Sequence, residues 1–413
     1  MTHIGADRLH PAHAGSDREL RVLLISGLSV NRLNSFRLQL ELLATHLSLR
    51  GCVCRIAGKK PSSDEPRQDA EFDFAPAGSD VPTPADSAAM APAGPVTPPT
   101  PTADVAELTT EQLRSSFPDF EPDVSILLGY PDQFPFIDES RRDFRVFLWA
   151  QFSHPPQRLH ERVTVVPLTD RTRSYILSAG ITKVGPTIPH AVDPLFGPVD
   201  HHEIVDHQRF GSAERSFLIG TAGTNQIRKR FDLLLDTFRL VLFRCPEAEL
   251  CIKTDRESSP SGFGLIREIA RRGIARSVTV LATESMGNPM PTAAMGELYR
   301  TFDLYLHTAE WEGFGIPVLE AIASGIPVVT HGGQGPGEFR PSPIIVGSTS
   351  VADESGATLR LISPSSAAAA IGHVMAAKPT RHLHSVASGG ADPLSRYRAP
   401  HVADAWLSVI RHE

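Results

Sequence analysis

The sequence is poor in the features that mark disulfide-rich, membrane-spanning and nucleic-acid-binding proteins. Four cysteines in 413 residues are too few and too scattered for a disulfide scaffold. No apolar run approaches the roughly 18 residues that cross a membrane, and the N-terminus lacks a signal-peptide core, so we expect cytoplasmic action. The formal net charge of −7 gives no overall basic field, which argues against nucleic acid as a partner.

Motifs for common cofactors are missing as well. A nicotinamide dinucleotide site needs G-x-G-x-x-G after the first strand, where Ser26-Gly-Leu-Ser29 stands instead. Cys52 and Cys54 alternate with apolar residues and no second pair lies at a ligand spacing, so they are interpreted as strand packing. No Asp-x-Asp pair is flanked by strands. We therefore expect neither a metal nor another cofactor.

The first half of the chain alternates strand-like and helix-like patterns. Residues 21–26 are an apolar run typical of a buried parallel strand. A helix is predicted next, capped by Asn34 or Ser35 and ended by Gly51, with apolar residues at helical spacing (Phe36, Leu40, Leu43 and Leu47). A short helix is expected near 108–116, and further strands at 53–57, 124–128, 144–149 and 163–166. This order predicts βαβ units of a doubly wound sheet.

The stretch between Pro61 and Val105 interrupts this pattern. It contains ten of the 35 prolines and almost no large apolar residues. Such a composition cannot bury enough surface to offset the entropy of ordering the chain. We predict a disordered insertion over residues 61–105, with a disordered regulatory segment as the functional alternative.

The second half has a clearer α/β pattern. Strands are predicted near 216–220, 249–253, 277–282, 304–307 and 326–330, alternating with helices near 229–243, 262–272, 293–301 and 316–324. This alternation predicts a parallel sheet covered by helices on both faces, so the fold class is α/β with two Rossmann-like domains. Ligands of such sheets bind beyond the carboxyl ends of the strands, which directs attention to the loops there.

The most informative segment is Glu310-Trp-Glu-Gly-Phe-Gly-Ile-Pro-Val-Leu-Glu320, which follows a predicted strand and opens a helix. Gly313 and Gly315 lack Cβ atoms, so their backbone can approach a ligand closely. A helix N-terminus adds partial positive charge at the same place. Two carboxylates, Glu312 and Glu320, flank this amide-rich turn. Taken alone, Glu312 is better explained as a helix cap and Glu320 as a solvated helix residue. The two together, with the glycines between them, favour a ligand with phosphates and hydroxyls.

This segment resembles the E-x7-E signature of retaining GT-B glycosyltransferases of the large family four. Lys229-Arg-Phe-Asp-Leu-Leu-Leu-Asp-Thr-Phe238 is similar to the family's K-G-x-D-x-L-L-x-A-F helix. Ile188-Pro-His-Ala-Val-Asp193 is similar to its I-P-N-G-V-D before the hinge, and residues 403–410 to its final helix. The likeness is strong over residues 213–340 and weak in the first half.

The resemblance implies a GT-B fold, two Rossmann-like domains facing each other across a cleft. A disordered tail (1–19) and a hinge (194–212) are expected at the domain margins. The acceptor-side domain is expected from residues 20–60, 106–193 and 396–413, and the donor-binding domain from residues 213–395.

The resemblance also implies roles for individual residues. Glu320 would bind the ribose hydroxyls, and Glu312 with the backbone of Gly313, Phe314 and Gly315 would hold the donor sugar and its phosphate. Lys229, helped by Arg228, would neutralise the departing diphosphate. Asn225 is a further donor-site candidate. The implied reaction is metal-independent transfer of a sugar from a nucleotide diphosphate donor to a glycan, lipid or small-molecule acceptor, with retention of configuration.

Three departures from the family pattern leave alternatives open. The Gly-Arg expected after the first strand of the second domain is replaced by Gly220-Thr221, and the paired glycines expected after the first strand of the chain are absent. A sugar-facing His expected in the first domain is matched by Gln151 or by His154. The alternatives are a catalytically impaired nucleotide- or sugar-binding relative and a GT-B phosphorylase. Seven Lys or Arg stand between Arg21 and Lys60 against one acid. A solvated surface is the favoured explanation, and weak peripheral contact with an anionic membrane is the alternative.

Overall fold

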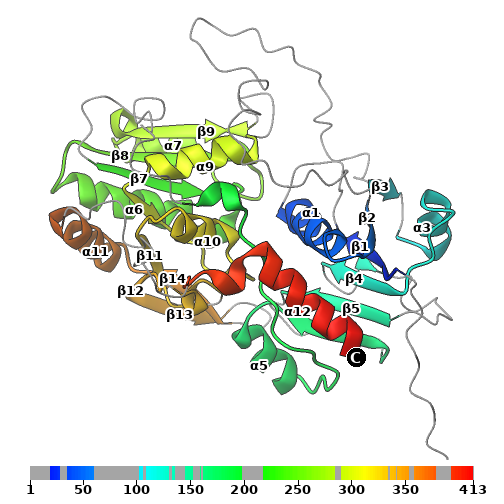
Figure 1. Ribbon diagram of the computed structural model, residues 1–413. Helices are drawn as coiled ribbons and strands as arrows, with labels where there is room; N and C mark the ends of the chain where they lie inside the picture. Colours follow the sequence, from blue (N-terminus) through cyan, green and yellow to red (C-terminus); the bar gives the residue numbers. More distant parts are fainter. Residues whose placement is uncertain are drawn as a thin grey trace, which may run out of the picture.

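The computed structural model describes residues 19–27, 35–59, 102–105, 108–129, 133–134, 145–151, 159, 161–197, 217–283, 290–333, 335–340, 342–352, 358–377 and 392–412. Within these ranges the chain forms two α/β domains (Figure 1). The predicted tail up to residue 18, most of the insertion, most of the hinge, the helix cap Asn34 and the site candidate His154 lie outside the described residues.

The first domain is built on a six-stranded sheet in which every neighbouring pair is parallel. Its order is β3-β2-β1-β4-β5-β6. Strands β1, β4, β5 and β6 are almost wholly buried because helices and loops cover both faces, and this explains their continuous apolar sequences. The strands are β1 (Arg21–Ser26), β2 (Val53–Lys59), β3 (Thr102–Val105), β4 (Val124–Leu128), β5 (Arg145–Ala150) and β6 (Val163–Pro167).

Helix α1 (Ser35–Ser48) follows β1 and buries Leu40, Leu43 and Leu47, as their helical spacing predicts. It ends in a turn where Gly51 adopts a positive φ of 83°. The other helices of this domain are α3 (Thr110–Ser116) and α5 (Asp170–Ser178). Each has a threonine at its N-cap, Thr109 and Thr169, whose side chain accepts a backbone N–H of the first turn.

The edge strand β3 corrects one boundary of the predicted insertion. Residues 102–105 were assigned to the disordered stretch, but they pair in parallel with β2, in a register that joins Ile56 to Thr102. Their composition is polar and proline-flanked, so no local pattern distinguishes them. The unpaired edge of β2 supplies the hydrogen bonds that make them a strand.

A deletion series tests this boundary. A parallel crossover needs about a dozen residues, so residues 62–100 are replaced with a Gly/Ser linker of about that length. We expect the melting temperature to stay within a few degrees of wild type, because loop length contributes only slowly growing closure entropy. Extending the replacement through Val105 should give a lower melting temperature than the first variant, because the edge of β2 would lose its partner strand. Equal melting temperatures for the two variants would show that β3 contributes nothing to stability.

The second domain has the same sheet order at a different place in the chain. Its six strands are all parallel and run β12-β11-β10-β7-β8-β9. In each sheet the first strand of the domain lies centrally and the chain winds outward in both directions from it. The strands are β7 (Phe217–Ala222), β8 (Ala248–Thr254), β9 (Val278–Ala282), β10 (Leu304–Leu306), β11 (Val328–His331) and β12 (Ile344–Val346). The fold class predicted from the sequence is confirmed.

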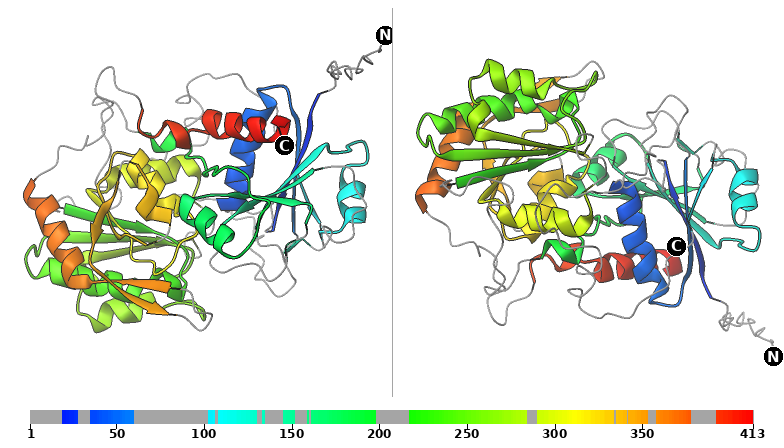
Figure 2. Two further views of the ribbon diagram at one scale, coloured as in Figure 1. Left: turned by 90° about the horizontal axis from the view of Figure 1, so that it is seen from below. Right: turned by 90° about the horizontal axis from the view of Figure 1, so that it is seen from above.

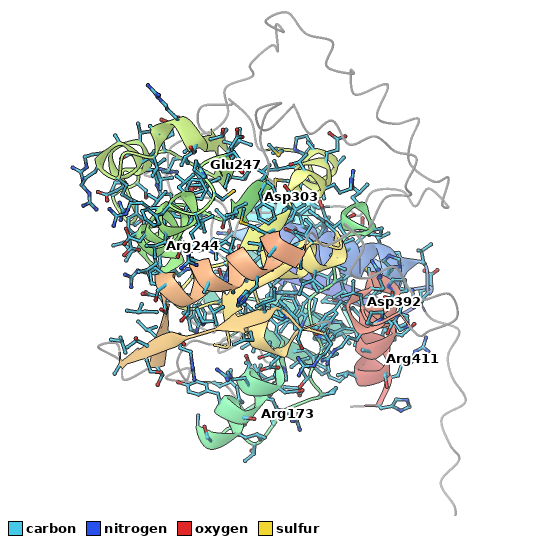
Figure 3. All side chains as sticks on the ribbon, turned by 90° about the vertical axis from the view of Figure 1, so that its left-hand side faces the viewer. Arg173, Arg244, Glu247, Asp303, Asp392 and Arg411 are labelled. Carbon is cyan, nitrogen blue, oxygen red and sulfur yellow. The ribbon has the colours of Figure 1, made fainter. Side chains whose placement is uncertain are left out.

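Helices cover both faces of the second sheet. They are α6 (Phe231–Leu242), α7 (Leu265–Arg271), α9 (Thr292–Thr301), α10 (Ile316–Ala323) and α11 (Pro364–Ala377). The antiparallel hairpin β13 (Ser348–Ala352) and β14 (Thr358–Ile362) and helix α11 were not predicted, and α11 lies on the outer side of the domain (Figure 3). Helix α6 begins two residues after the predicted start, because Arg230 has a left-handed conformation.

The C-terminal helix α12 (Ala399–His412) returns to the first domain and lies against α1 (Figures 1 and 2). Its Trp406 is fully buried, with its ring 5.5 Å from Trp149 and 6.0 Å from Phe147. On the surface Arg50 of the first domain donates to Asp404 at 2.9 Å. One apolar cluster, which includes Trp149 and Trp406, continues into the second domain through Phe314. The two domains therefore share part of a core.

A polar contact also joins the domains. The carboxylate of Glu338, in the second domain, accepts the N–H groups of Asp170 and Arg171 at 2.8 Å each. These are the first two residues of α5, so a carboxylate of one domain caps a helix N-terminus of the other. Ser324 adds a hydrogen bond of 3.0 Å to the Phe196 carbonyl at the end of the first half.

No helix in the described part of the chain combines the length and apolar character needed to cross a membrane. Four of the described basic residues of the first domain have contacts of their own. Arg37 pairs with Glu41, and Arg50 with Asp404. Arg21 and Arg55 lie over the Phe120 ring. Contact with an anionic membrane stays a prediction, and these pairings give it no added support.

Candidate active site

The candidate site lies where the second sheet reverses its winding. Strands β7 and β10 are neighbours at this point, and the segments that leave their carboxyl ends are 223–230 and 307–315. In open α/β sheets this switch point is where ligands bind. The two segments are joined by backbone: the Glu310 N–H donates to the Arg228 carbonyl at 2.8 Å. Thr308 Oγ1 donates to the Lys229 carbonyl at 3.0 Å.

Three predicted site residues meet at this point. Lys229 Nζ donates to Glu312 Oε1, and Arg228 Nη1 donates to Glu312 Oε2 at 3.2 Å. Lys229 and Glu312 are each 9% exposed, whereas Arg228 is about one-third exposed in its side chain. Two cations therefore meet one carboxylate, and the charge left over is positive. Such an excess at a sheet switch point suits an anionic ligand.

A histidine that the sequence reasoning missed completes this cluster. His307 is buried at the end of β10, with Nε2 3.6 Å from Glu312 Oε1 and Nδ1 2.9 Å from Thr330 Oγ1. His331, one strand over, donates from Nε2 to the Ala309 carbonyl at 2.6 Å and accepts the Gly333 N–H at 3.1 Å. The available signal was position, since His307 ends one predicted strand and His331 directly follows another.

Burial and charge act against each other in this cluster. Burial by itself would raise the pKa of Glu312, but Lys229, His307 and Arg228 hold it well below its usual value. Burial lowers the pKa of Lys229, with Glu312 opposing the change. Burial also lowers the pKa of His307, and that of His331 falls to about 4. At neutral pH the cluster therefore carries an ionised carboxylate beside uncharged imidazoles.

Glu320 lies apart from Glu312, on helix α10, in surroundings that oppose its ionisation. Burial raises its pKa to about 7, and the nearby Asp193 carboxylate adds to the rise. Tyr299 and Lys253 partly offset it. Asp193 belongs to the Ile188–Asp193 segment at the end of the first half. The described residues thus leave the Glu320 carboxyl half protonated at neutral pH.

The glycines between the two glutamates are required by close packing. Gly315 has a φ of 90°, and a Cβ added there would lie 2.7 Å from Pro336. A Cβ on Gly313 would lie 3.0 Å from the Cβ of Gln151. The turn therefore brings the first-domain candidate Gln151 against the second-domain loop. The Phe314 side chain packs in the shared core against Phe339 rather than pointing toward a ligand.

Asn225 has its side chain engaged within the second domain. Its Nδ2 donates to the Phe263 carbonyl at 2.7 Å, and its Oδ1 accepts the Phe263 N–H at 2.8 Å. Its backbone N–H donates to Asp255. These contacts fix the loop after β8. Its predicted contact with the donor stays a prediction, and these bonds assign it a supporting position.

The first-domain side of the site contains a second residue that was missed. His190 is buried, with its ring 4.6 Å from Trp149 and 5.1 Å from Phe314. Its Nδ1 has no hydrogen-bond partner among the described residues, and burial lowers its pKa to about 3. The residue was noted only as part of the Ile188–Asp193 segment. A neutral imidazole therefore lies at the domain junction, beside the Gly313–Gly315 turn.

Comparison with known proteins agrees with this geometry. Residues 203–340 match the family described as glycosyl transferases group 1. That segment includes both glutamates, the two cations and both glycines of the site. Over this segment the chain is similar to the glycosyl transferases group 1 family. The resemblance stated from the sequence is therefore confirmed at the level of the family and the GT-B fold.

Named relatives are similar over part of the chain. The chain is 30% identical over 146 residues to mannosylfructose-phosphate synthase of Agrobacterium fabrum, covering 34% of this chain and 31% of that protein. It is 28% identical over 185 residues to D-inositol 3-phosphate glycosyltransferase of Kribbella flavida, covering 42% and 43%. The matched stretches span less than half the length of either relative.

Solved structures share the fold over nearly the whole chain. HepE of Anabaena, solved with UDP and glucose, superposes with a TM-score of 0.61 at 13% identity, covering 96% of this chain and 100% of that one. A glycosyltransferase of Rickettsia africae gives 0.65 at 11% identity, covering 95% and 98%. At these identities the likeness establishes the two-domain GT-B architecture.

Proposed function

We propose that this protein is a glycosyltransferase that takes a sugar from a nucleotide diphosphate donor and transfers it with retention of the anomeric configuration. The observation that carries the proposal is the buried Glu312, held by Lys229 and Arg228 at the switch point of the second sheet. The family match over residues 203–340 and the relatives named as glycosyltransferases support it.

The excess cationic charge has a direct use in this reaction. The bond between the anomeric carbon and the diphosphate breaks, and its electrons pass to the diphosphate oxygen. The acceptor hydroxyl forms the new bond to carbon, and its proton passes to the departing diphosphate oxygen. Charge thus builds on phosphate in the transition state, where Lys229 and Arg228 would stabilise it. The Glu312 carboxylate has lone pairs beyond those used in its ion pairs, and these would accept hydrogen bonds from sugar hydroxyls.

Glu320 fits the nucleoside side of the same donor. An ionised carboxylate accepts hydrogen bonds from the hydroxyl groups of a ribose. These bonds favour the ionised form of the carboxyl group. The backbone of Gly313–Gly315 would approach the donor sugar. Transfer without a divalent metal is part of the proposal, because the two cations supply the positive field. The acceptor, whether glycan, lipid or small molecule, is not specified by these residues.

Two measurements test the proposal. Thermal shift with UDP, GDP and ADP should reveal stabilisation by at least one nucleotide, since binding to the native state alone raises stability with the logarithm of saturation. Incubation of the corresponding sugar nucleotide in EDTA should then release nucleotide and a sugar product. Proton NMR of that product reads the anomeric coupling. An inverted product, or activity restored only by added metal, would refute retention and metal independence respectively.

A catalytically impaired nucleotide-binding protein is the second candidate. One observation favours it: Thr221 follows Gly220 where the family resemblance predicts an arginine for the diphosphate. Arg228 is the described cation that would replace it. Tight nucleotide binding with no release of sugar from any donor tested would decide for this alternative. A GT-B phosphorylase would instead require inorganic phosphate for turnover.

A further inference from the structure

The turn that carries Arg228 and Lys229 has an unusual conformation at the next residue. Arg230 has φ 52° and ψ 48°, the left-handed region, and among the described residues it is the one non-glycine with positive φ. A side chain in this conformation crowds its own backbone, and such residues persist where their surroundings fix them. The resembling family motif has glycine at this position, which would adopt the turn without strain. Contacts of the arginine side chain must therefore offset this backbone cost.

Its contacts show what the side chain holds. Arg230 Nε and Nη2 donate to both oxygens of Asp232, at 3.0 and 2.6 Å. Its Nη1 donates to Glu310 Oε2 at 3.2 Å. The side chains of Arg230 and Glu310 are only 20% and 15% exposed. One arginine thus ties the start of α6 to the loop after β10.

These two segments carry the two halves of the charge cluster. Lys229 immediately precedes Arg230, and Glu312 lies two residues beyond Glu310. The backbone hydrogen bond from the Glu310 N–H to the Arg228 carbonyl joins the same two segments as the side-chain bridge of Arg230. The relative position of cation and carboxylate is therefore fixed twice, once by backbone and once by Arg230.

We propose that Arg230, acting through Glu310, is a positioning residue that sets Lys229 against Glu312 and so prepares the site for an anionic donor phosphate. It does not itself touch the ligand. The alternative is that Arg230 only stabilises the N-terminus of α6 through Asp232. The catalytic part of the inference rests on the proposed function, whereas the placement of Lys229 can be measured in the protein without any ligand.

The first experiment measures the reactivity of the Lys229 amine toward acetic anhydride, with labelling read by mass spectrometry. Lys229 is 9% exposed and engaged with Glu312, so wild type should label slowly. Arg230→Gly keeps the left-handed turn and removes the side chain. We expect Lys229 labelling to rise several-fold in this variant. Glu310→Gln should produce a similar rise, and the double variant should label no faster than either single one.

A matched control separates positioning from helix stability. Arg239 is an exposed arginine on the same helix, far from the turn, and Arg239→Gly removes a side chain and weakens α6. It should leave Lys229 labelling at the wild-type rate. Unchanged labelling in Arg230→Gly, or an equal rise in Arg239→Gly, would overturn the proposal.

The second experiment follows the consequence for UDP and for turnover. In Arg230→Gly we expect turnover to fall about tenfold or more, because misplacement of a charge by an ångström removes transition-state stabilisation, with a smaller change in the Kd of UDP. Increased labelling combined with no nucleotide binding by wild type would refute the proposed function and leave the positioning role intact. Increased labelling with unchanged turnover would refute the catalytic part of this inference.

Discussion

Replacing Lys229 with methionine is expected to lower turnover roughly 10²–10³-fold, the usual effect of removing one group that stabilises transition-state charge. The side chain keeps its volume and loses its ammonium, so Glu312 retains Arg228 and His307 as neighbours. Affinity for UDP should fall much less than turnover, because charge on the diphosphate grows as the bond to the sugar breaks. Steady-state kinetics with the preferred sugar nucleotide and calorimetry with UDP give the two numbers.

Stability must be measured beside activity in this variant, because loss of one partner leaves a buried carboxylate with less compensation. Lys59→Met is the matched control, since Lys59 is an exposed lysine at the end of β2. It should retain wild-type melting temperature and turnover. If Lys229→Met weakens UDP binding as much as it slows turnover, the ammonium acts on the ground state, and its proposed role at the leaving group is wrong.

The second large expected effect is a dependence of nucleotide affinity on pH, caused by ionisation of Glu320. Its pKa is raised to about 7, and in the proposed site the ionised form is the one that would accept hydrogen bonds from ribose hydroxyls. Nucleotide affinity should therefore rise roughly tenfold between pH 6 and pH 8, the range over which the carboxyl ionises. Glu320→Gln should lose this part of the pH dependence and bind UDP more weakly at pH 8, by on the order of 1.5–3 kcal/mol. Calorimetry with UDP at several pH values measures both.

The same carboxyl makes a prediction about stability. Its folded pKa of about 7 lies above the ordinary 4.5, so the native state holds the proton more tightly than the unfolded chain. The resulting stability is fully present below pH 4.5 and is lost as the pH rises through 7, at about 1.4 kcal/mol per unit of pKa shift.

Glu320→Gln should therefore gain melting temperature relative to wild type at pH 8 and show no gain at pH 4.5. A constant difference between the two proteins across this range would show that Glu320 has an ordinary pKa. A pH-independent affinity of wild type for UDP would show that the ribose does not contact this carboxyl.

The regular elements were predictable because their patterns are local. Five of the six strands of the second sheet begin and end within two residues of their predicted positions, since buried parallel strands are continuously apolar. The edge strand β12 was not predicted. The polar edge strand β3 and the exposed hairpin β13–β14 have no such pattern. The conformation of β3 comes from hydrogen bonds to β2, which is distant in the sequence. That of β13 and β14 comes from their hydrogen bonds to each other. The local sequence pattern therefore does not predict these strands.

The sequence by itself determined several of the residue types in the site: two glutamates separated by seven residues, two glycines between them, and a pair of cations before a helix. It did not reveal the two histidines. It could not determine that Lys229 and Arg228 both bind Glu312, because these residues lie more than eighty positions apart. The pKa of Glu320 also depends on Asp193 from the other half of the chain. The interaction between two charges depends on their distance in space and not on their separation along the chain. Only the tertiary structure therefore decided that the pKa of Glu312 is lowered and that of Glu320 is raised.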